Sequence, residues 1–383
     1  MAAPKFKEME RAYGFEEVAI VPGDTTINPD QTNTDLKIGN FTFSIPVMAA
    51  AMDAVVDPNF AIVLHKLGGL AVLNLDGIQA RYKKPEEILA KITQAPDTEV
   101  TSLLQKIYSE PVKEELIGER IQTIKRAGAT CAVSMIPANA KRLAPVAKEA
   151  GADILVVQST VTTARHTSKS YRGLIFSELC QTIGLPVIVG NCVTYSATLE
   201  LMRAGIDGIL VGIGPGAACT TREVLGVGVP QVTATMDCAA ARETYFKETG
   251  KYIAVITDGG MRTGSDLCKA FASGADAVML GSIMAQAKEA PGRGYHWGMA
   301  HSHPTLPRGT RIKAGVRAPL EQLLFGPTST TDGTENFVGA LRTAMGVCGA
   351  LTIKDMHKVK MVIAPAIKTE GKYFQSIQRM RSG

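Results

Sequence analysis

The stretch PVIVGNCVTYSATLELMRAGIDGILVGIG, residues 186–214, contains two short apolar runs separated by one amphipathic segment. The runs PVIVGN (186–191) and GILVGIG (208–214) each have the length and composition of a strand that is buried on both faces. Between them, SATLELMRAGI spaces its apolar residues as a helix does and has a glycine near its end. The stretch is therefore typical of a β-α-β unit in a parallel sheet.

The same pattern repeats along most of the chain. Further strands are predicted at residues 45–50, 69–74, 131–136, 153–159, 253–259 and 277–282. Eight β-α units over roughly 280 residues favour a single closed (β/α)8 barrel, a TIM barrel, as the one domain of residues 1–383. A doubly wound open sheet is the alternative, but it usually has fewer strands in such regular succession.

Two intervals interrupt this rhythm. Residues 75–128 contain charged, helix-like stretches and are predicted to form a short helical insert after the second strand. Residues 292–335 are rich in Gly, Pro, Ser, Thr and His, and they are predicted to form either a disordered segment or a functional flap. The helix-like stretch NFVGALRTAMGVCGA after them indicates that the chain then returns to the barrel.

Composition limits the classes of function. The chain has 383 residues, and its formal net charge of +5 is too small and too dispersed to indicate a nucleic-acid partner. Because no run of about 18 apolar residues indicates a membrane span, we expect no membrane partner and a cytoplasmic location. The seven cysteines are scattered and never form a CxxC pair, which argues against a disulfide framework and against a zinc site.

Active sites of such barrels lie at the carboxyl ends of the strands. The predicted strand ends carry Gly190-Asn191, Gly212 to Gly216, Asp258-Gly259-Gly260 and Gly281-Ser282. The last two follow the seventh and eighth strands, where backbone N–H groups exposed by glycine and the Ser282 hydroxyl would bind a phosphate. Cys219 follows the sixth strand, so we expect its thiol within reach of a ligand bound there.

Each of these features also has a purely structural interpretation. A Gly-Gly pair after a strand is a common tight turn, Asp258 is a suitable N-cap for the next helix, and an isolated cysteine is more often inert than reactive. Their combination on successive strand ends nevertheless favours a ligand site in which Cys219 is the nucleophile.

The segment GIGPGAACTTREVLGVGVPQ (212–231) is similar to the catalytic-cysteine loop of IMP dehydrogenases and GMP reductases. The resemblance extends along nearly the whole chain, in the order of the family, through IPVMAAAMDAV, HKLGGLAVLN, VGNCVT, ITDGGMRTGSDLCKAFASGADAVMLGS and GALRTAMGVCGALTI. Typical IMP dehydrogenases carry two regulatory cystathionine-synthase-type (CBS) modules after the second strand, where this chain has only the insert at 75–128. The chain most resembles the IMP dehydrogenase-related bacterial branch that lacks these modules.

The resemblance implies oxidation of IMP to XMP with NAD, through a covalent bond from Cys219 to C2 of the purine. Beside Cys219, it implies a catalytic role for the Thr221 hydroxyl. Substrate contacts are implied for Met52, Gly216, Asp258, Gly260, Gly281, Ser282, Gly298 and Met299. Cofactor contacts are implied for Gln158, Ser159, Asn191 and Gly212. The family's potassium site corresponds to the carbonyl groups of Gly214, Gly216 and Cys219, and its barrels form homotetramers or octamers.

The chain also departs from the family pattern. Ala50 and Ala217 stand where serines that contact IMP are common, and Gln158 replaces the Asp of an Asp-Ser pair that dehydrogenases use for NAD. The flap has no Arg-Tyr pair to activate water, and Arg308 stands where a reductase has a Glu. Arg308 or Arg311 is the candidate for activating water, and a solvated or phosphate-pairing arginine is the more common alternative.

Three functions are therefore compared. An IMP dehydrogenase is favoured because the reductase Glu is absent. A GMP reductase, which converts GMP and NADPH to IMP and ammonia, is the alternative within the same class. A non-catalytic purine-nucleotide-binding regulator is the alternative outside it, because the altered flap is compatible with a loss of turnover. A metal site at His301 and His303 is a weaker candidate because no partner ligands are evident.

Overall fold

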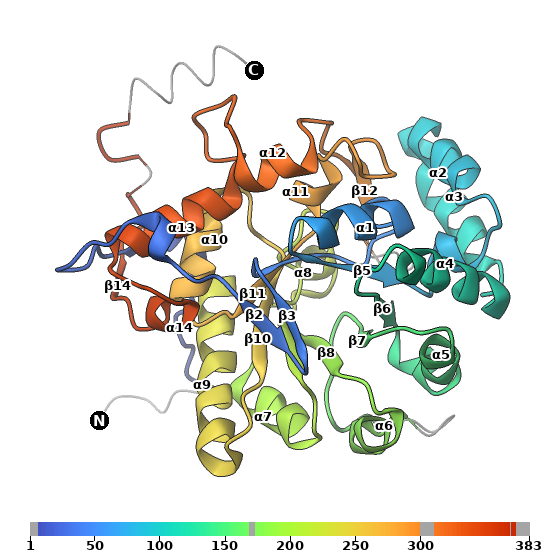
Figure 1. The fold of residues 1–383 in the computed structure, drawn as a ribbon, viewed down its shortest axis with the longest axis horizontal. Coiled ribbons are helices and arrows are strands. Elements are labelled where there is room, and N and C mark those ends of the chain that lie inside the picture. The colour runs from blue at the N-terminus through green and yellow to red at the C-terminus, as the bar shows by residue number, and fades with distance from the viewer. Residues whose placement is uncertain (1–6, 168–172, 299–309, 368, 373–383) are drawn as a thin grey trace.

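The structure, a computed structural model, describes residues 7–167, 173–298, 310–367 and 369–372. Eight parallel strands form a closed barrel (Figure 1): β4 (Val47–Ala49), β5 (Leu70–Asn74), β6 (Ala132–Met135), β7 (Ile154–Gln158), β8 (Val187–Cys192), β9 (Gly208–Val211), β10 (Ala254–Asp258) and β11 (Ala277–Leu280). Neighbours in the chain are neighbours in the sheet, and the pairing of β11 with β4 closes the ring. The predicted (β/α)8 barrel is confirmed, and the open sheet is excluded.

Alternate strand residues fill the interior of the barrel. One buried apolar cluster contains Met48, Leu70, Val72, Ala132, Ile154, Val156, Ile188, Leu210, Ala254, Ile256, Ala277 and Met279. The same cluster includes side chains of the hairpin formed by β2 (Leu36–Ile38) and β3 (Phe41–Phe43). Because this hairpin directly precedes β4, it covers the amino-terminal end of the barrel and leaves the carboxyl-terminal end open.

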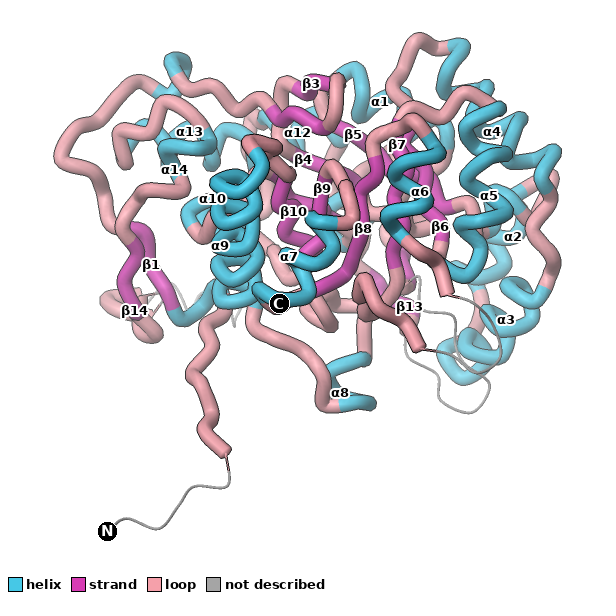
Figure 2. The backbone as a smooth tube through the Cα atoms, turned by 90° about the horizontal axis from the view of Figure 1, so that it is seen from below, coloured by secondary structure: helices cyan, strands magenta, loops and turns pink. Residues whose placement is uncertain are grey.

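Helices surround the strands, as Figure 2 shows. Those that follow the strands in the chain are α1 (Pro58–Lys66), α4 (Glu114–Arg126), α5 (Pro137–Glu149), α6 (Phe176–Ile183), α7 (Tyr195–Arg203), α9 (Gln231–Thr249), α10 (Gly264–Ala272) and α11 (Ser282–Ala285). Their starts have clear local causes. Pro58 is the first residue of α1, and the Asp57 side chain accepts a hydrogen bond from the N–H of Phe60.

The interval 75–128 contains three α-helices. The first two, α2 (Pro85–Gln94) and α3 (Asp97–Ser109), lie outside the ring on the side away from α13 (Phe337–Val347) and α14 (Ile353–Met356) (Figures 1 and 2). The third, α4, packs against α1 and α5 and so belongs to the ring. The residues added to the barrel are therefore α2 and α3 with their connections.

The remaining elements cover the ends and one side of the barrel. They are η1 (Phe15–Glu17), β1 (Val18–Ile20), η2 (Pro29–Gln31), η3 (Ile78–Ala80), α8 (Thr221–Leu225), β12 (Tyr295–Trp297), β13 (Arg311–Lys313), α12 (Leu320–Phe325), α13 (Phe337–Val347), α14 (Ile353–Met356) and β14 (Met361–Ile363). β1 pairs with β14 in antiparallel orientation, so residues 18–20 lie beside residues 361–363. Within the described segments, no helix is both long and apolar enough to cross a membrane.

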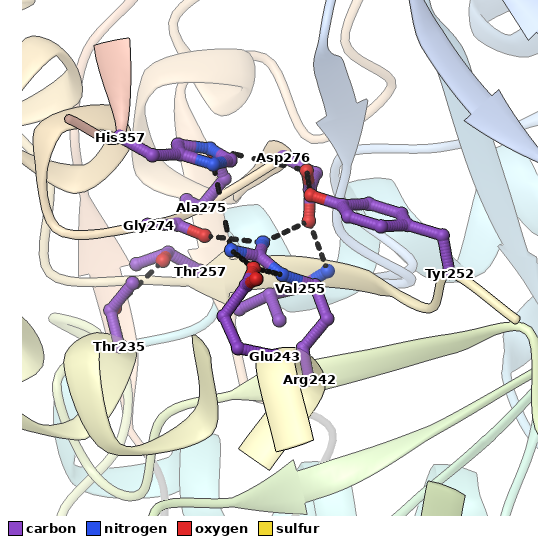
Figure 3. Close-up of polar contacts among 10 residues, drawn as sticks. All are labelled: Thr235, Arg242, Glu243, Tyr252, Val255, Thr257, Gly274, Ala275, Asp276 and His357. Atoms are coloured by element: carbon purple, nitrogen blue, oxygen red, sulfur yellow. Dashed lines mark hydrogen bonds and ion pairs between the residues drawn. The ribbon is translucent and has the colours of Figure 1, made fainter. Parts of the chain in front are cut away.

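A buried polar cluster joins these layers at the amino-terminal ends of β10 and β11 (Figure 3). The Arg242 guanidinium of α9 donates a hydrogen bond to Asp276 Oδ2 at 2.7 Å, and the Tyr252 hydroxyl donates to Asp276 Oδ1 at 2.7 Å. His357, at the end of α14, lies within hydrogen-bond distance of the Ala275 carbonyl. Because barrel active sites lie at the opposite ends of the strands, we interpret this cluster as structural.

Candidate active site

The carboxyl-terminal ends of the strands open into a cavity of about 1210 Å³. The predicted contact residues that line it are Met52, Gln158, Ser159, Asn191, Gly212, Gly214, Gly216, Cys219, Asp258, Gly260, Gly281, Ser282 and Gly298. The structure thus brings together positions from six strand ends and from the flap. Four further predicted residues, Met299, His301, His303 and Arg308, lie outside the described residues.

The loop that contains Cys219 runs from the end of β9 to the start of α8. The Cys219 thiol is partly exposed at the cavity and donates a hydrogen bond to Thr221 Oγ1 at 3.1 Å. Thr221 is fully buried behind it, so this hydroxyl has a fixed position next to the sulfur. Arg222, for which no role was predicted, donates hydrogen bonds to the carbonyls of Ile213 and Val229. These bonds connect the two sides of the loop.

Asp258 and Asn191 meet at the mouth of the cavity. The Asn191 side-chain amide donates to Asp258 Oδ2 at 2.7 Å. Burial raises the pKa of Asp258 to about 6, and the hydrogen bond from Asn191 opposes that increase. The interpretation of Asp258 as a helix cap is wrong, because α10 is capped by Thr263, whose hydroxyl accepts from the N–H of Asp266.

Gln231, the first residue of α9, joins the ends of β9 and β10. Its amide nitrogen lies 3.1 Å from the Val211 carbonyl oxygen and 3.0 Å from that of Asp258. Gly212 passes just beside this contact with φ near +148°, and a Cβ there would lie 2.4 Å from the Asp258 carbonyl oxygen. The predicted glycine therefore has a structural cause as well as a place at the cavity.

The ends of β4 and β11 form the opposite wall. A Cβ at Gly281 would lie 2.9 Å from the Met52 sulfur, so the missing side chain leaves room for Met52 at the cavity. The main-chain N–H groups near Gly260, Gly281 and Ser282 are the neutral donors available to an anionic group. The geometry is compatible with a phosphate at this wall and a planar ring beside Met52.

The stem of the flap is the antiparallel pair β12 and β13. Arg311, in β13, donates to the carbonyls of Ile92 and Ala95 at the carboxyl end of α2 and pairs with Asp97 of α3. Arg311 thus contacts the insert and is not among the residues that line the cavity. The hypothesis that Arg311 activates water is therefore not supported by its position.

His296, in β12, is a cavity residue that the sequence analysis missed. It is 1% exposed, and neither ring nitrogen has a hydrogen-bond partner in the described part of the chain. Burial lowers its pKa to about 4, so the imidazole is neutral near pH 7. The short strand Tyr295–Trp297 does not alternate between apolar and polar residues, so no sequence pattern pointed to His296. Which face of the strand meets the cavity depends on packing.

Comparisons with known proteins agree with this arrangement. The IMP dehydrogenase / GMP reductase domain model matches residues 12–302. An uncharacterized oxidoreductase of Mycobacterium tuberculosis (strain ATCC 25618 / H37Rv) is 39% identical over 363 residues, which are 92% of this chain and 96% of the relative. The inosine-5'-monophosphate dehydrogenase of Methanocaldococcus jannaschii is 27% identical, with 95% of each chain covered.

A solved structure shows the same architecture over almost the whole length. The crystal structure of an IMP dehydrogenase/GMP reductase-like protein from Corynebacterium glutamicum superposes with a TM-score of 0.89 at 35% sequence identity. The match covers 94% of this chain and 96% of the other. The similarity therefore extends beyond the barrel strands.

Proposed function

Because this chain belongs to the IMP dehydrogenase/GMP reductase family of oxidoreductases, we propose that it oxidises IMP to XMP with NAD. The observation that carries the proposal is the contact between the Cys219 thiol and the buried Thr221 hydroxyl at the cavity that also contains Asp258 and Gly281. This arrangement places a nucleophile, a hydroxyl, a carboxylate and main-chain donors around one ligand volume. All of them are groups that covalent oxidation of a nucleotide requires.

The proposed reaction has two stages. The Cys219 sulfur, as thiolate, adds to C2 of the purine, and the C2 hydrogen leaves as a hydride, so that C2 becomes a thioimidate carbon bonded to sulfur. When bound, NAD supplies the acceptor for that hydride. Water then adds to C2, the C2–S bond breaks with its electron pair on sulfur, and XMP leaves with one proton released to solvent. The Cys219 thiolate is regenerated, and the sum is IMP, NAD and water to XMP, NADH and a proton.

The chain's own residues bind and orient the nucleotide. We propose that Asp258 accepts hydrogen bonds from the ribose hydroxyls, with its ionised form held in place by Asn191. We assign the phosphate to the wall formed by Gly260, Gly281 and Ser282, and the purine ring to the surface beside Met52. The Thr221 hydroxyl would then lie next to the carbon that Cys219 attacks.

The residues proposed for NAD fit a dinucleotide in part. The cavity exceeds the volume of typical small-molecule pockets, about 300–1,000 Å³, so it has room for a second ligand. Gln158 and Ser159 line it at the end of β7, and Gln158 offers both a donor and an acceptor to a ribose. The Ser159 hydroxyl is within hydrogen-bond distance of the Val161 carbonyl, so its donor is already engaged. We expect Gln158 to make the stronger contact.

The potassium site has weaker support. Of the three carbonyls assigned to it, that of Gly216 already accepts a hydrogen bond from the Cys219 N–H at 3.0 Å. The proposed reaction therefore includes no step that involves a cation. A requirement for potassium remains a prediction.

Two alternatives are tested against the same site. A GMP reductase would use the same cysteine and cavity, but Arg308 stands where that enzyme has a Glu. A non-catalytic regulator would not need the paired Cys219 and Thr221, which are intact in this chain. Both observations favour the dehydrogenase.

One assay separates the three functions. Purified protein is mixed with IMP and NAD, and separately with GMP and NADPH, while the absorbance of the reduced nicotinamide is followed. We expect NADH formation from IMP that Cys219→Ala abolishes. Oxidation of NADPH in the presence of GMP would identify a reductase instead, and tight IMP binding without turnover in either mixture would identify a regulator.

We also propose that the protein acts as a homotetramer or octamer in the cytoplasm, with nucleotides as its small-molecule partners. Size-exclusion chromatography with light scattering measures the oligomeric state directly, and a monomer at micromolar concentration would contradict this part of the proposal.

A further inference from the structure

The insert formed by α2 and α3 has its own small apolar core, and two residues of that core come from the active-site side. The buried members are Ala54, Ile78, Leu89, Ile92, Val100, Leu104, Ile107 and Trp297. Ala54 lies two residues after Met52, which lines the cavity, and Trp297 lies next to the cavity residues His296 and Gly298. The insert therefore packs on both the loop after β4 and the stem of the flap.

A chain of hydrogen bonds connects the same two segments through Tyr108 of α3. The Trp297 indole N–H donates to the Tyr108 hydroxyl oxygen at 2.8 Å, and that hydroxyl donates to Asp53 Oδ2 at 2.5 Å. The second oxygen of Asp53 accepts from the Ile78 N–H at 3.0 Å. Because an indole only donates and a carboxylate only accepts, these two groups set the direction of both hydrogen bonds.

The flap stem has two further attachments. Arg311 of β13 donates to the last carbonyls of α2, and its guanidinium lies 5.1 Å from the centre of the Tyr295 ring in the neighbouring strand. At the base of the stem, the Gly292 N–H donates to the Ala54 carbonyl at 2.9 Å. Both strands of the stem are thus held by residues outside the barrel ring.

This packing determines which side of β12 meets the cavity. Successive residues of a strand point to opposite faces, so with Trp297 in the core of the insert, His296 faces the other way. His296 lines the cavity, and Met52 is the residue directly before Asp53. The position of Tyr108 therefore fixes two walls of the cavity relative to each other.

We propose that α2 and α3 support the flap stem, and that Tyr108 is a positioning residue that holds the Met52 wall and the His296 wall of the nucleotide cavity together. This inference rests on the proposed function only for the identity of the nucleotide. The segment that contains α2 and α3 occupies the position at which the family's regulatory modules are usually inserted, and in this chain it would support the flap stem.

The test compares two conservative variants on the same insert. Tyr108→Phe removes the hydroxyl that joins Trp297 to Asp53. Tyr82→Phe removes a hydroxyl that donates to the Ile107 carbonyl at 2.9 Å and has no hydrogen bond to Asp53 or Trp297, so it is the matched control for loss of one partly buried bond at the insert. Hydrogen–deuterium exchange of peptides covering residues 50–56 and 292–298, IMP affinity by calorimetry, and Tm are measured for both.

Tyr108→Phe removes the bonds to both Trp297 and Asp53. We expect it to raise exchange in both peptides and to weaken IMP binding by about three- to tenfold, which corresponds to the free energy of about one net hydrogen bond. Tyr82→Phe should leave exchange in the two peptides and IMP affinity within about twofold of the parent protein, even if it lowers Tm as much as Tyr108→Phe does. Trp297→Phe removes the bond to Tyr108 but leaves the bond from Tyr108 to Asp53, so it should raise exchange mainly in the 292–298 peptide. Because the two variants share the Trp297–Tyr108 bond, the double variant should lose less IMP affinity than the sum of the two single losses.

The outcomes separate this inference from the proposed function. If Tyr108→Phe and Tyr82→Phe give the same exchange in the two peptides, the support role is rejected. If exchange rises but IMP affinity does not change, the positioning role is rejected. If the parent protein does not bind IMP at all, the proposed function fails, while the exchange data still decide whether the insert supports the stem.

Discussion

The Asn191 amide donates to the Asp258 carboxylate at 2.7 Å, and this bond joins the ends of two barrel strands that are not neighbours. β9 lies between β8 and β10 in the barrel. The bond therefore crosses the carboxyl end of β9, next to Gly212, which has no side chain to obstruct it. Burial of the carboxylate at the cavity costs free energy and raises its pKa, and the hydrogen bond from Asn191 opposes that increase. A ligand that donates hydrogen bonds to Asp258 would recover part of that cost.

The first prediction concerns the pH dependence of substrate binding. The pKa of Asp258 in the free protein is about 6, so the carboxylate is ionised above that pH and protonated below it. We expect KM for IMP to rise as the pH falls through 6, because a protonated Asp258 is a poorer acceptor for ribose hydroxyls. Asp258→Asn should have a raised KM at pH 8. The pH dependence of its KM should retain only the titration of the substrate phosphate. If KM of the variant depends on pH as that of the parent protein does, the assignment of Asp258 is wrong.

The second prediction concerns the hydroxyl beside the nucleophile. Thr221→Val keeps the shape of the side chain but removes the group 3.1 Å from the Cys219 sulfur. We expect kcat to fall by about 10- to 100-fold with IMP affinity nearly unchanged. Thr220→Val is the matched control, because the Thr220 hydroxyl is buried without a partner among the described residues. Equal losses in the two variants would exclude a specific role for Thr221.

Much of the fold was predictable from short-range pattern. The strands β7 and β9 are buried at every position and contain no polar side chain except that of Gln158, because both faces of a barrel strand are covered. Such runs contrast clearly with the amphipathic helices between them. The location of Asp258, Cys219 and Gly281 around one cavity followed from the rule that strand ends of a barrel converge. Neither inference required knowledge of side-chain packing.

The contacts of the flap and insert were not predictable in this way. Tyr108 and Trp297 are separated by 189 residues, and each occurs in a stretch whose pattern also suits a solvated surface element. Arg311 illustrates the same limit, because a sequence shows its charge but not that helix carbonyls lie nearest to it. Such contacts depend on how irregular segments pack onto a finished barrel.

The third prediction concerns the cation. If the carbonyls of Gly214, Gly216 and Cys219 bind potassium, replacing potassium with sodium at constant ionic strength should lower kcat by at least about tenfold, because a smaller ion fits a carbonyl cage of that size poorly. Steady-state rates in the two salts measure this. Equal rates would show that the family's ion site has no function in this chain.

The fourth prediction concerns stability and Asp53. Burial raises the pKa of Asp53 from its ordinary value of 3.8 to about 6, and the hydrogen bond from Tyr108 opposes that shift. Between these values the folded protein holds a proton that the unfolded chain has released, so the free energy of unfolding falls as the pH rises from 3.8 to 6. The fall attributable to Asp53, which is 2% exposed, is up to about 3 kcal/mol.

Urea unfolding at several pH values checks this slope. Asp53→Asn cannot ionise, and its single carbonyl oxygen keeps only one of the two bonds that the Asp53 oxygens accept from Tyr108 and the Ile78 N–H. The variant should therefore be less stable overall, but its stability should change less steeply than that of the parent protein between pH 4 and 6. Asp258 contributes a slope of the same sign to both proteins, so the difference between the two curves isolates Asp53. Parallel curves would mean that Asp53 is not buried as the structure has it.

The fifth prediction tests the close approach of Gly212 to Asp258 at the cavity. Gly212→Ala places a Cβ 2.4 Å from the Asp258 carbonyl oxygen at a φ near +148°, which residues other than glycine rarely adopt. We expect a loss of about 2–5 kcal/mol in the free energy of unfolding, from backbone strain and the displacement of β10. Gly216→Ala is the stability control, because a Cβ there meets no heavy atom within 4 Å. Similar Tm values for the two variants would show that the end of β9 does not approach Asp258 this closely, and with that the placement of the carboxylate over the cavity would also be wrong.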